Sequence, residues 1–118
     1  MAVRSAVPTN LYDGVVLYTW SGLLNGDTGE PVEAVGHADR TIQVLGTFSV
    51  GGTIICEGSL DGTNYATLTD PQGNAISKTA AGIEMVSELT KVIRPSVTAG
   101  DGSTSLTAIL LVRRAQRP

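Results

Sequence analysis

The chain has 118 residues, the size of one domain with a single hydrophobic core. Residues 5–112 hold four basic and eleven acidic side chains, a balance of −7 that repels phosphate backbones, so we exclude nucleic acid as a partner of this part. The sequence has neither the ~7–15 residue apolar stretch of a signal peptide nor the ~20 apolar residues that cross a bilayer. We therefore expect a protein made in a cytoplasm, with no membrane partner.

Residues 1–12 show no alternation of apolar and polar side chains, and we expect them to form an N-terminal arm. The first expected strand is Val15–Trp20, which places Tyr18 and Trp20 on one face of a sheet. We expect Trp20 in the core; the alternative is that its ring is a platform on which a sugar stacks. A polar stretch then leads to a second expected strand at residues 32–35.

The clearest alternation in the chain lies at Thr41–Ser49. The residues that would share its core face are Ile42, Val44, Gly46 and Phe48. Val50–Gly52 is predicted to be a hairpin turn, because glycine adopts the positive φ of tight connections. It leads to a strand at Thr53–Ser59, where the single cysteine, Cys56, points inward as a small apolar core residue.

The remaining expected strands are separated by turns, of which residues 70–73 and 100–102 are the clearest. They lie at Tyr65–Thr69, Ala75–Thr79, Ile83–Leu89, Val92–Thr98 and Ser105–Val112. The segment Ile83–Leu89 also fits a short helix. The run Ser105–Val112 is apolar on both faces, which is typical of a strand at the centre of a sandwich or at an interface.

About eight short strands at spacings of roughly 8–14 residues predict an all-β protein, an antiparallel β-sandwich of jelly-roll type. The sandwich domain is expected at residues 13–113, followed by a C-terminal tail at residues 114–118. Only 16% of the residues are charged, below the ~25% of an average soluble domain, which favours burial against partner proteins.

Residues for catalysis or metal binding are few. His37 is the only histidine and lies in a polar turn, where a histidine is usually solvated. Asp27 and Glu30 share one loop, and other loop aspartates accompany glycines, which backbone capping explains without a metal ion. We therefore expect no catalytic residue, no metal site and no cofactor, and hence no enzyme.

The run Glu57 to Asn74, with the stretches Ile93-Arg94-Pro95 and residues 100–108, resembles small structural proteins of tailed bacteriophages. The pattern is similar to that of capsid decoration (cement) proteins. This resemblance implies a jelly-roll sandwich that binds the outside of the virion as a symmetric homodimer or homotrimer. It also implies a major capsid protein as partner, at the joints between capsid subunits. The alternative is a carbohydrate-binding or host-surface-binding β-module of a phage tail or fibre.

Both chain ends carry candidate partner-binding residues. These are Val3, Arg4, Arg113, Arg114 and Arg117. The terminal arginines could bind an acidic protein surface or nucleic acid, or form a solubilising tail without a partner. If both ends are arms, deleting residues 1–10 should leave the melting temperature nearly unchanged.

Overall fold

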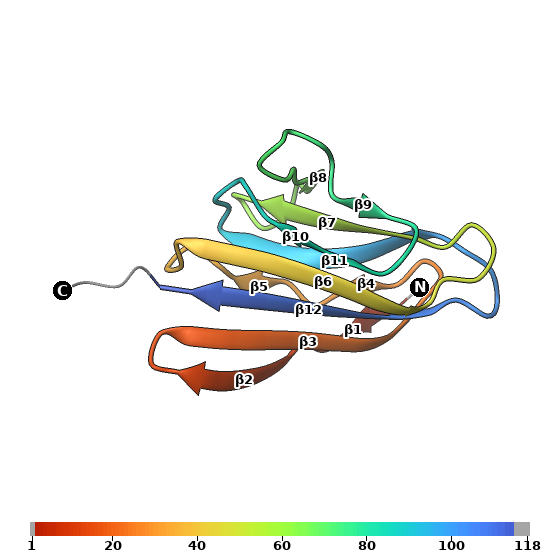
Figure 1. The fold of residues 1–118 in the computed structure, drawn as a ribbon, viewed down its shortest axis with the longest axis horizontal. Coiled ribbons are helices and arrows are strands. Elements are labelled where there is room, and N and C mark those ends of the chain that lie inside the picture. Colours follow the sequence, from red (N-terminus) through yellow and green to blue (C-terminus); the bar gives the residue numbers. More distant parts are fainter. Residues whose placement is uncertain (1, 115–118) are drawn as a thin grey trace.

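In the computed structural model, which describes residues 2–114, the chain forms two β-sheets packed face to face (Figure 1). This confirms the predicted all-β, antiparallel sandwich. The part of the chain that the structure describes contains no helix long and apolar enough to cross a membrane. The strands are β1 (Val3–Arg4), β2 (Val7–Tyr12), β3 (Val15–Leu24), β4 (Thr28–Gly29), β5 (Val32–Glu33), β6 (Asp39–Thr47), β7 (Thr53–Ser59), β8 (Ala66–Thr67), β9 (Ser77–Lys78), β10 (Gly82–Met85), β11 (Val92–Ala99) and β12 (Ser105–Arg113).

The strand order is that of a jelly roll. The five-stranded sheet has the order β10-β6-β12-β3-β2, and the seven-stranded sheet has the path β1-β4-β11-β7-β8, with β5 beside β11 and β9 beside β7. β4 and β5 can be counted as one interrupted strand, and so can β8 and β9. The chain from β3 to β12 then has eight strands in two four-stranded layers, β3-β12-β6-β10 and β4/5-β11-β7-β8/9. The predicted jelly roll, with about eight strands, is therefore what the topology shows.

The prediction of a hairpin at Val50–Gly52 is wrong. The strands on either side of it, β6 and β7, belong to different sheets, so the turn carries the chain across the sandwich. Ser49 and Gly51 have positive φ values of 58° and 73°. A Cβ on Gly52 would lie 2.0 Å from the Phe48 carbonyl oxygen, so only glycine fits there. Tight turns within a sheet and between sheets use the same residues, and the sequence does not separate them.

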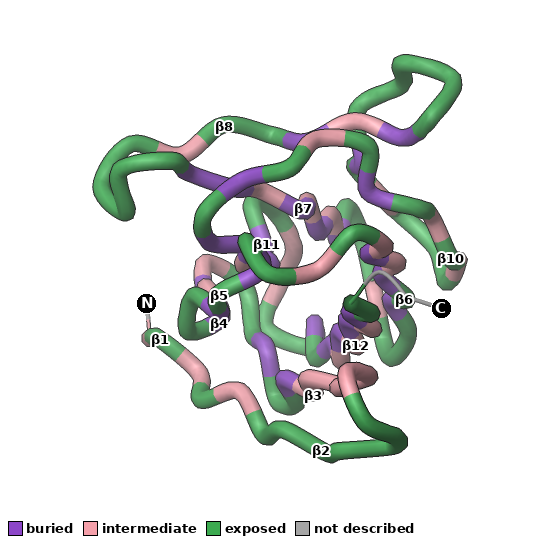
Figure 2. Tube along the Cα trace, turned by 90° about the vertical axis from the view of Figure 1, so that its left-hand side faces the viewer, coloured by how far each residue is buried: buried purple, intermediate pink, exposed green. Residues whose placement is uncertain are grey.

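The segment expected as an N-terminal arm is placed in strands. β1 pairs in parallel with β4, and β2 pairs with β3 at the edge of the five-stranded sheet. All six residues of β2 are exposed, because no strand of the other sheet lies against it (Figure 2). A strand exposed on both faces needs no alternation of apolar side chains, so the sequence of β2 carries no strand pattern.

The core follows the alternation that the sequence predicts. Along β12, the residues that face the other sheet are buried: Leu106, Ala108, Leu110 and Val112. β12 is the central strand of its sheet, as its apolar character on both faces predicts. Trp20 is fully buried and its indole N–H donates to the Glu30 carbonyl oxygen at 3.0 Å. Ile83–Leu89 contains most of strand β10 and no helix.

Candidate functional site

The predicted N-terminal site residues lie on β1. Val3 is exposed, whereas Arg4 is half-buried and its Nε donates to Asp27 Oδ2 at 2.8 Å. The Ala2 amide donates to Asp27 Oδ1 at 2.9 Å, and the Leu24 amide donates to Oδ2 at the same distance. Arg4 is therefore tied to the sandwich by a buried carboxylate, and Val3 is the member of the pair that is free to contact a partner.

The hydrogen-bond donors around Asp27 change the pKa of its carboxylate. Burial by itself would raise its pKa, because the charged form loses water. The hydrogen bonds from Leu24, Arg4 and Ala2 outweigh burial and hold the pKa of Asp27 below its ordinary value. The charged carboxylate thus joins the first strand to the turn after β3.

The C-terminal candidates are ion-paired across strands. Arg113, the last residue of β12, donates from Nε to Asp39 Oδ2 at 2.8 Å. Arg114 lies 3.3 Å from Asp13 Oδ1. Both pairs are exposed, so each contributes little to stability and can exchange its partner for another carboxylate. Arg117, the fifth predicted residue, lies outside the described residues.

The structure does not bring these two groups together. Val3 pairs with Thr28, beyond the end of β3, whereas Arg113 pairs with Val15 at the start of β3. The ten residues of β3 span roughly 30 Å, in a molecule 49 Å long. In Figure 1, β1 lies toward the right of the long axis and β12 ends toward its left. The predicted residues therefore lie in two separate places on the molecule.

An exposed edge that sequence reasoning did not identify lies between them, along β2. Tyr12 is 77% exposed, and Val7 and Leu11 also present their side chains to solvent. The strand pairs with β3 on one side only. Its sequence, Val-Pro-Thr-Asn-Leu-Tyr, contains no charged residue. In the sequence, the only indication of this edge strand is a group of hydrophobic residues beside a proline. Many loops share that pattern.

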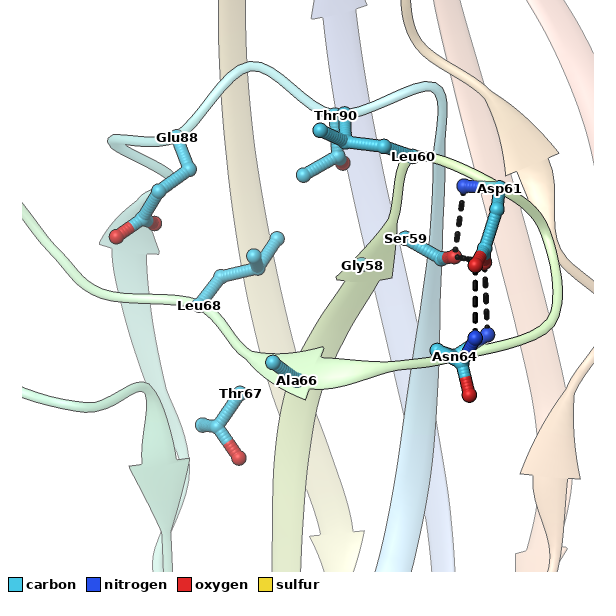
Figure 3. A pocket seen from close by; sticks show the side chains of 10 residues that line it. All are labelled: Gly58, Ser59, Leu60, Asp61, Asn64, Ala66, Thr67, Leu68, Glu88 and Thr90. Carbon is cyan, nitrogen blue, oxygen red and sulfur yellow. Dashed lines mark hydrogen bonds between the residues drawn. The ribbon is translucent and has the colours of Figure 1, made fainter.

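A hollow of about 480 Å³ lies between the loop after β7 and the segment before β11 (Figure 3). Ser59, Asp61 and Asn64 line one side, and Leu68, Glu88 and Thr90 line the other. Asp61 Oδ1 accepts hydrogen bonds from the Ser59 hydroxyl and from the amides of Thr63 and Asn64, each at 2.8 Å. These bonds hold the pKa of Asp61 well below its usual range.

The opposite carboxylate, Glu88, is also engaged. It accepts from the Thr69 amide at 2.7 Å and from the Thr69 hydroxyl. Burial would raise the pKa of Glu88, and the bonds from Thr69 together with the nearby charge of Arg40 lower it. Both carboxylates that line the hollow therefore make structural hydrogen bonds: Asp61 within its own loop, and Glu88 to the segment after β8. The motif around Ser59 and Asp61, which carries the family resemblance, is a self-contained turn.

Among the aromatic residues of the described chain, Tyr12 is largely exposed and the others offer little for a carbohydrate. Trp20 is fully buried, so the expectation of a core residue is confirmed and its ring cannot stack on a sugar. Tyr18 packs against it, with ring centroids 6.5 Å apart. Tyr65 is covered by Arg94, whose guanidinium carbon lies 3.7 Å from the ring centroid and whose Nε donates to Glu57 at 2.7 Å.

The two remaining side chains that could be reactive are those of Cys56 and His37. Cys56 is buried, and desolvation, followed by the charges of Glu57 and Glu88, raises its pKa to about 12. His37 is half-buried rather than solvated, and its carbonyl oxygen accepts a hydrogen bond from Arg40 at 2.8 Å. Within residues 2–114, no three histidine, cysteine or acidic side chains lie close enough together to hold a metal ion.

No protein-family model matches the chain, and no curated protein matches its sequence. Among solved structures, the fold is similar to that of the SPBc2 prophage-derived protein YomS, with a TM-score of 0.62. The alignment covers 88% of this chain and 98% of that one, at 12% sequence identity. At that identity the likeness shows a shared fold across nearly the whole sandwich.

Proposed function

We propose that the protein is a non-enzymatic virion protein of a tailed bacteriophage, which binds the outside of the assembled capsid and stabilises joints between major capsid protein subunits. It acts as a homodimer or homotrimer, is made in the host cytoplasm, and requires no cofactor, nucleic acid or membrane. The fold shared with a prophage-derived protein supports the phage origin. The sequence resemblance to decoration proteins supports the place on the capsid.

The observation that carries the proposal is the edge formed by β2. An edge strand presents unpaired backbone N–H and C=O groups, to which a strand of another protein can add. Proteins protect such edges with charged residues, prolines or β-bulges. β2 contains Pro8 and a register irregularity between Asn10 and Tyr12, but it has no charged residue along its length. Its exposed Val7, Leu11 and Tyr12 supply apolar contact area along the strand.

Capsid stabilisation follows from binding by mass action. A ligand that binds only the assembled lattice favours that lattice over its separated subunits. Val3 near one end, Arg113 and Arg114 at the other, and β2 between them allow one molecule to contact several capsid subunits. Many such contacts on one particle, each weak, give strong total binding.

The direct test is co-sedimentation of the purified protein with capsids that lack it. We expect the protein to pellet with these capsids, saturably, at micromolar concentration. A Leu11→Asp, Tyr12→Asp variant should bind at least about tenfold more weakly, because it places charges on an apolar edge. Both positions are exposed, so the melting temperature of the variant should stay close to that of the unchanged protein.

The matched control is Val50→Asp, which adds the same charge to an 82% exposed residue in the turn between β6 and β7. It should bind capsids as the unchanged protein does. If the unchanged protein stays in the supernatant, the proposed function is wrong. If the β2 variant binds as tightly as the control, capsid binding does not use this edge.

A further inference from the structure

The outer face of the five-stranded sheet is apolar and uncharged over most of its area. Its residues alternate with the buried ones along each strand and are Leu17, Thr19, Thr41, Gln43, Leu45, Ile83, Met85, Thr107, Ile109 and Leu111. The outer face of a solvated antiparallel sheet normally carries charged side chains. The ten residues of this outer face include six aliphatic or thioether side chains and no charged one. The strands that carry them, β10, β6, β12 and β3, lie side by side in Figure 1.

The register arranges these side chains in rows. Met85, Thr41, Leu111 and Leu17 lie opposite one another on four neighbouring strands. The next row holds Ile83, Gln43, Ile109 and Thr19. The aliphatic residues of β10 and β12 therefore stand on either side of the more polar Thr41 and Gln43 of β6.

This arrangement makes a groove along β6. Two hollows, of about 250 and 200 Å³, adjoin there and share Thr41 and Leu111 as lining residues. The second hollow is lined almost entirely by carbon and includes Ile83 and Ile109. Ile83 is 60% exposed and stands at the rim as part of a ridge with Met85. A face that has both a ridge and a groove can pack against a copy of itself, as a two-fold axis requires.

The charge distribution allows a second copy at this face. The chain has a net charge of −3, so most faces of two copies repel each other. On this face the nearest charges, Asp39 and Arg113 at one end, neutralise each other in an ion pair. Two copies can meet here without bringing like charges together or burying an unpaired charge.

The area is just sufficient for a specific dimer. Four strands ~4.8 Å apart and up to about eight residues long at ~3.3 Å each cover on the order of 500 Å². Two such faces would bury about 1,000 Å² in total, the least that a specific interface needs. Sheets that pack face to face in this way lie about 10 Å apart.

We propose that the outer face of the five-stranded sheet is covered by the same face of a second copy, which gives a two-fold dimer with four stacked sheets. The inference rests on the oligomeric form in the proposed function, but it does not depend on the capsid as target. The β2 edge remains outside the stacked area, so the dimer presents two such edges to other proteins.

The test is sedimentation equilibrium of the full chain, without capsids. The unchanged protein should sediment as a dimer at micromolar concentration. Ile83→Lys should weaken self-association by at least about tenfold, because it places an unpaired ammonium group inside the interface. Ile109→Lys, at the centre of the face, should have at least the same effect. Leu60→Lys, at an exposed position in the loop after β7, is the matched control and should leave the dimer intact.

Circular dichroism shows whether each variant is folded. If Ile109→Lys does not fold, the self-association of Ile83→Lys alone decides the test. A monomeric or trimeric unchanged protein would overturn the inference, as would an Ile83→Lys dimer as tight as the control. If the unchanged protein is a monomer and Ile83→Lys loses capsid binding, a capsid protein covers this face. That result overturns self-association, and with it the oligomer in the proposed function, and leaves capsid binding standing.

Discussion

At the residue scale, two buried charged side chains hold distant segments together, and each gives a prediction. Asp27 accepts hydrogen bonds from Ala2, Arg4 and Leu24. Its pKa is lower in the folded protein than the ordinary value of 3.8. The charged form is therefore favoured by folding, and the stability that it contributes is complete above about pH 4 and is lost as the pH falls through the lower, folded-state pKa.

We predict that Asp27→Asn lowers the melting temperature at neutral pH and reduces the loss of stability between about pH 4 and pH 2. Glu88 and Asp61 also have lowered pKa values, so part of the acid destabilisation should remain in the variant. Urea denaturation at a series of pH values measures both effects. Parallel acid profiles for the variant and the unchanged protein would show that Asp27 does not contribute.

Arg40 is the second such residue. It is 4% exposed, and its guanidinium donates to the carbonyl oxygens of His37 and Ala38 and, through Nη2, to that of Glu88 at 3.0 Å. It thus ties the loop before β6 to the segment before β11.

Arg40→Met keeps the aliphatic part of the side chain and removes these donors. We expect a loss of roughly 1–3 kcal/mol in the free energy of unfolding, because buried carbonyl groups lose their partners. Arg113→Met, which removes an exposed arginine of an ion pair, is the control and should cost less than about 1 kcal/mol. Equal losses in the two variants, measured by urea denaturation, would contradict this account of Arg40.

The sequence was informative about apolar residues and much less so about these charged ones. Alternation placed Trp20, Cys56 and the inner face of β12 in the core, and all are buried. Arg40 continues the same alternation and would be assigned to the surface by its type alone. Its burial depends on a carbonyl group 48 residues away, and that of Asp27 on an arginine 23 residues away. Local patterns do not contain such distant partners.

At the element scale, the long strands could be predicted and the connections could not. The expected segments Thr53–Ser59, Val92–Thr98 and Ser105–Val112 match β7, β11 and β12 to within one residue. Period-two alternation is a strong signal where one face of a strand is buried. The turn at residues 50–52 and the edge strand β2 lack a distinguishing pattern, because their placement depends on which sheet receives the next strand.

The N-terminal segment gives the prediction at this scale. The sequence suggested that its removal would leave the melting temperature unchanged, whereas the structure assigns it β1, β2 and two donors to Asp27. We predict that deleting residues 2–12 costs roughly 1–3 kcal/mol, since the Asp27 charge stays buried without Arg4. For a domain of this size that lowers the melting temperature by at least about 4 °C. An unchanged melting temperature would mean that the segment is detached in solution.

At the scale of the whole molecule, the jelly roll is a rigid body that leaves three kinds of surface for partners. The β2 edge offers backbone groups, the two ends of the 49 Å long axis offer exchangeable ion pairs and an exposed valine, and the outer face of the five-stranded sheet offers an apolar groove. The sequence indicated a protein that contacts other proteins, through its sparse charge and the two apolar faces of β12. It could not indicate which surface serves which partner, because that depends on how the strands are ordered.

The most direct test of the proposed function is an electron cryomicroscopy reconstruction of capsids with and without the protein bound. The account predicts additional density on the outer surface, at joints between capsid subunits, with β2 of each sandwich against the shell. Additional density on the tail, or identical reconstructions at saturating protein concentration, would contradict it.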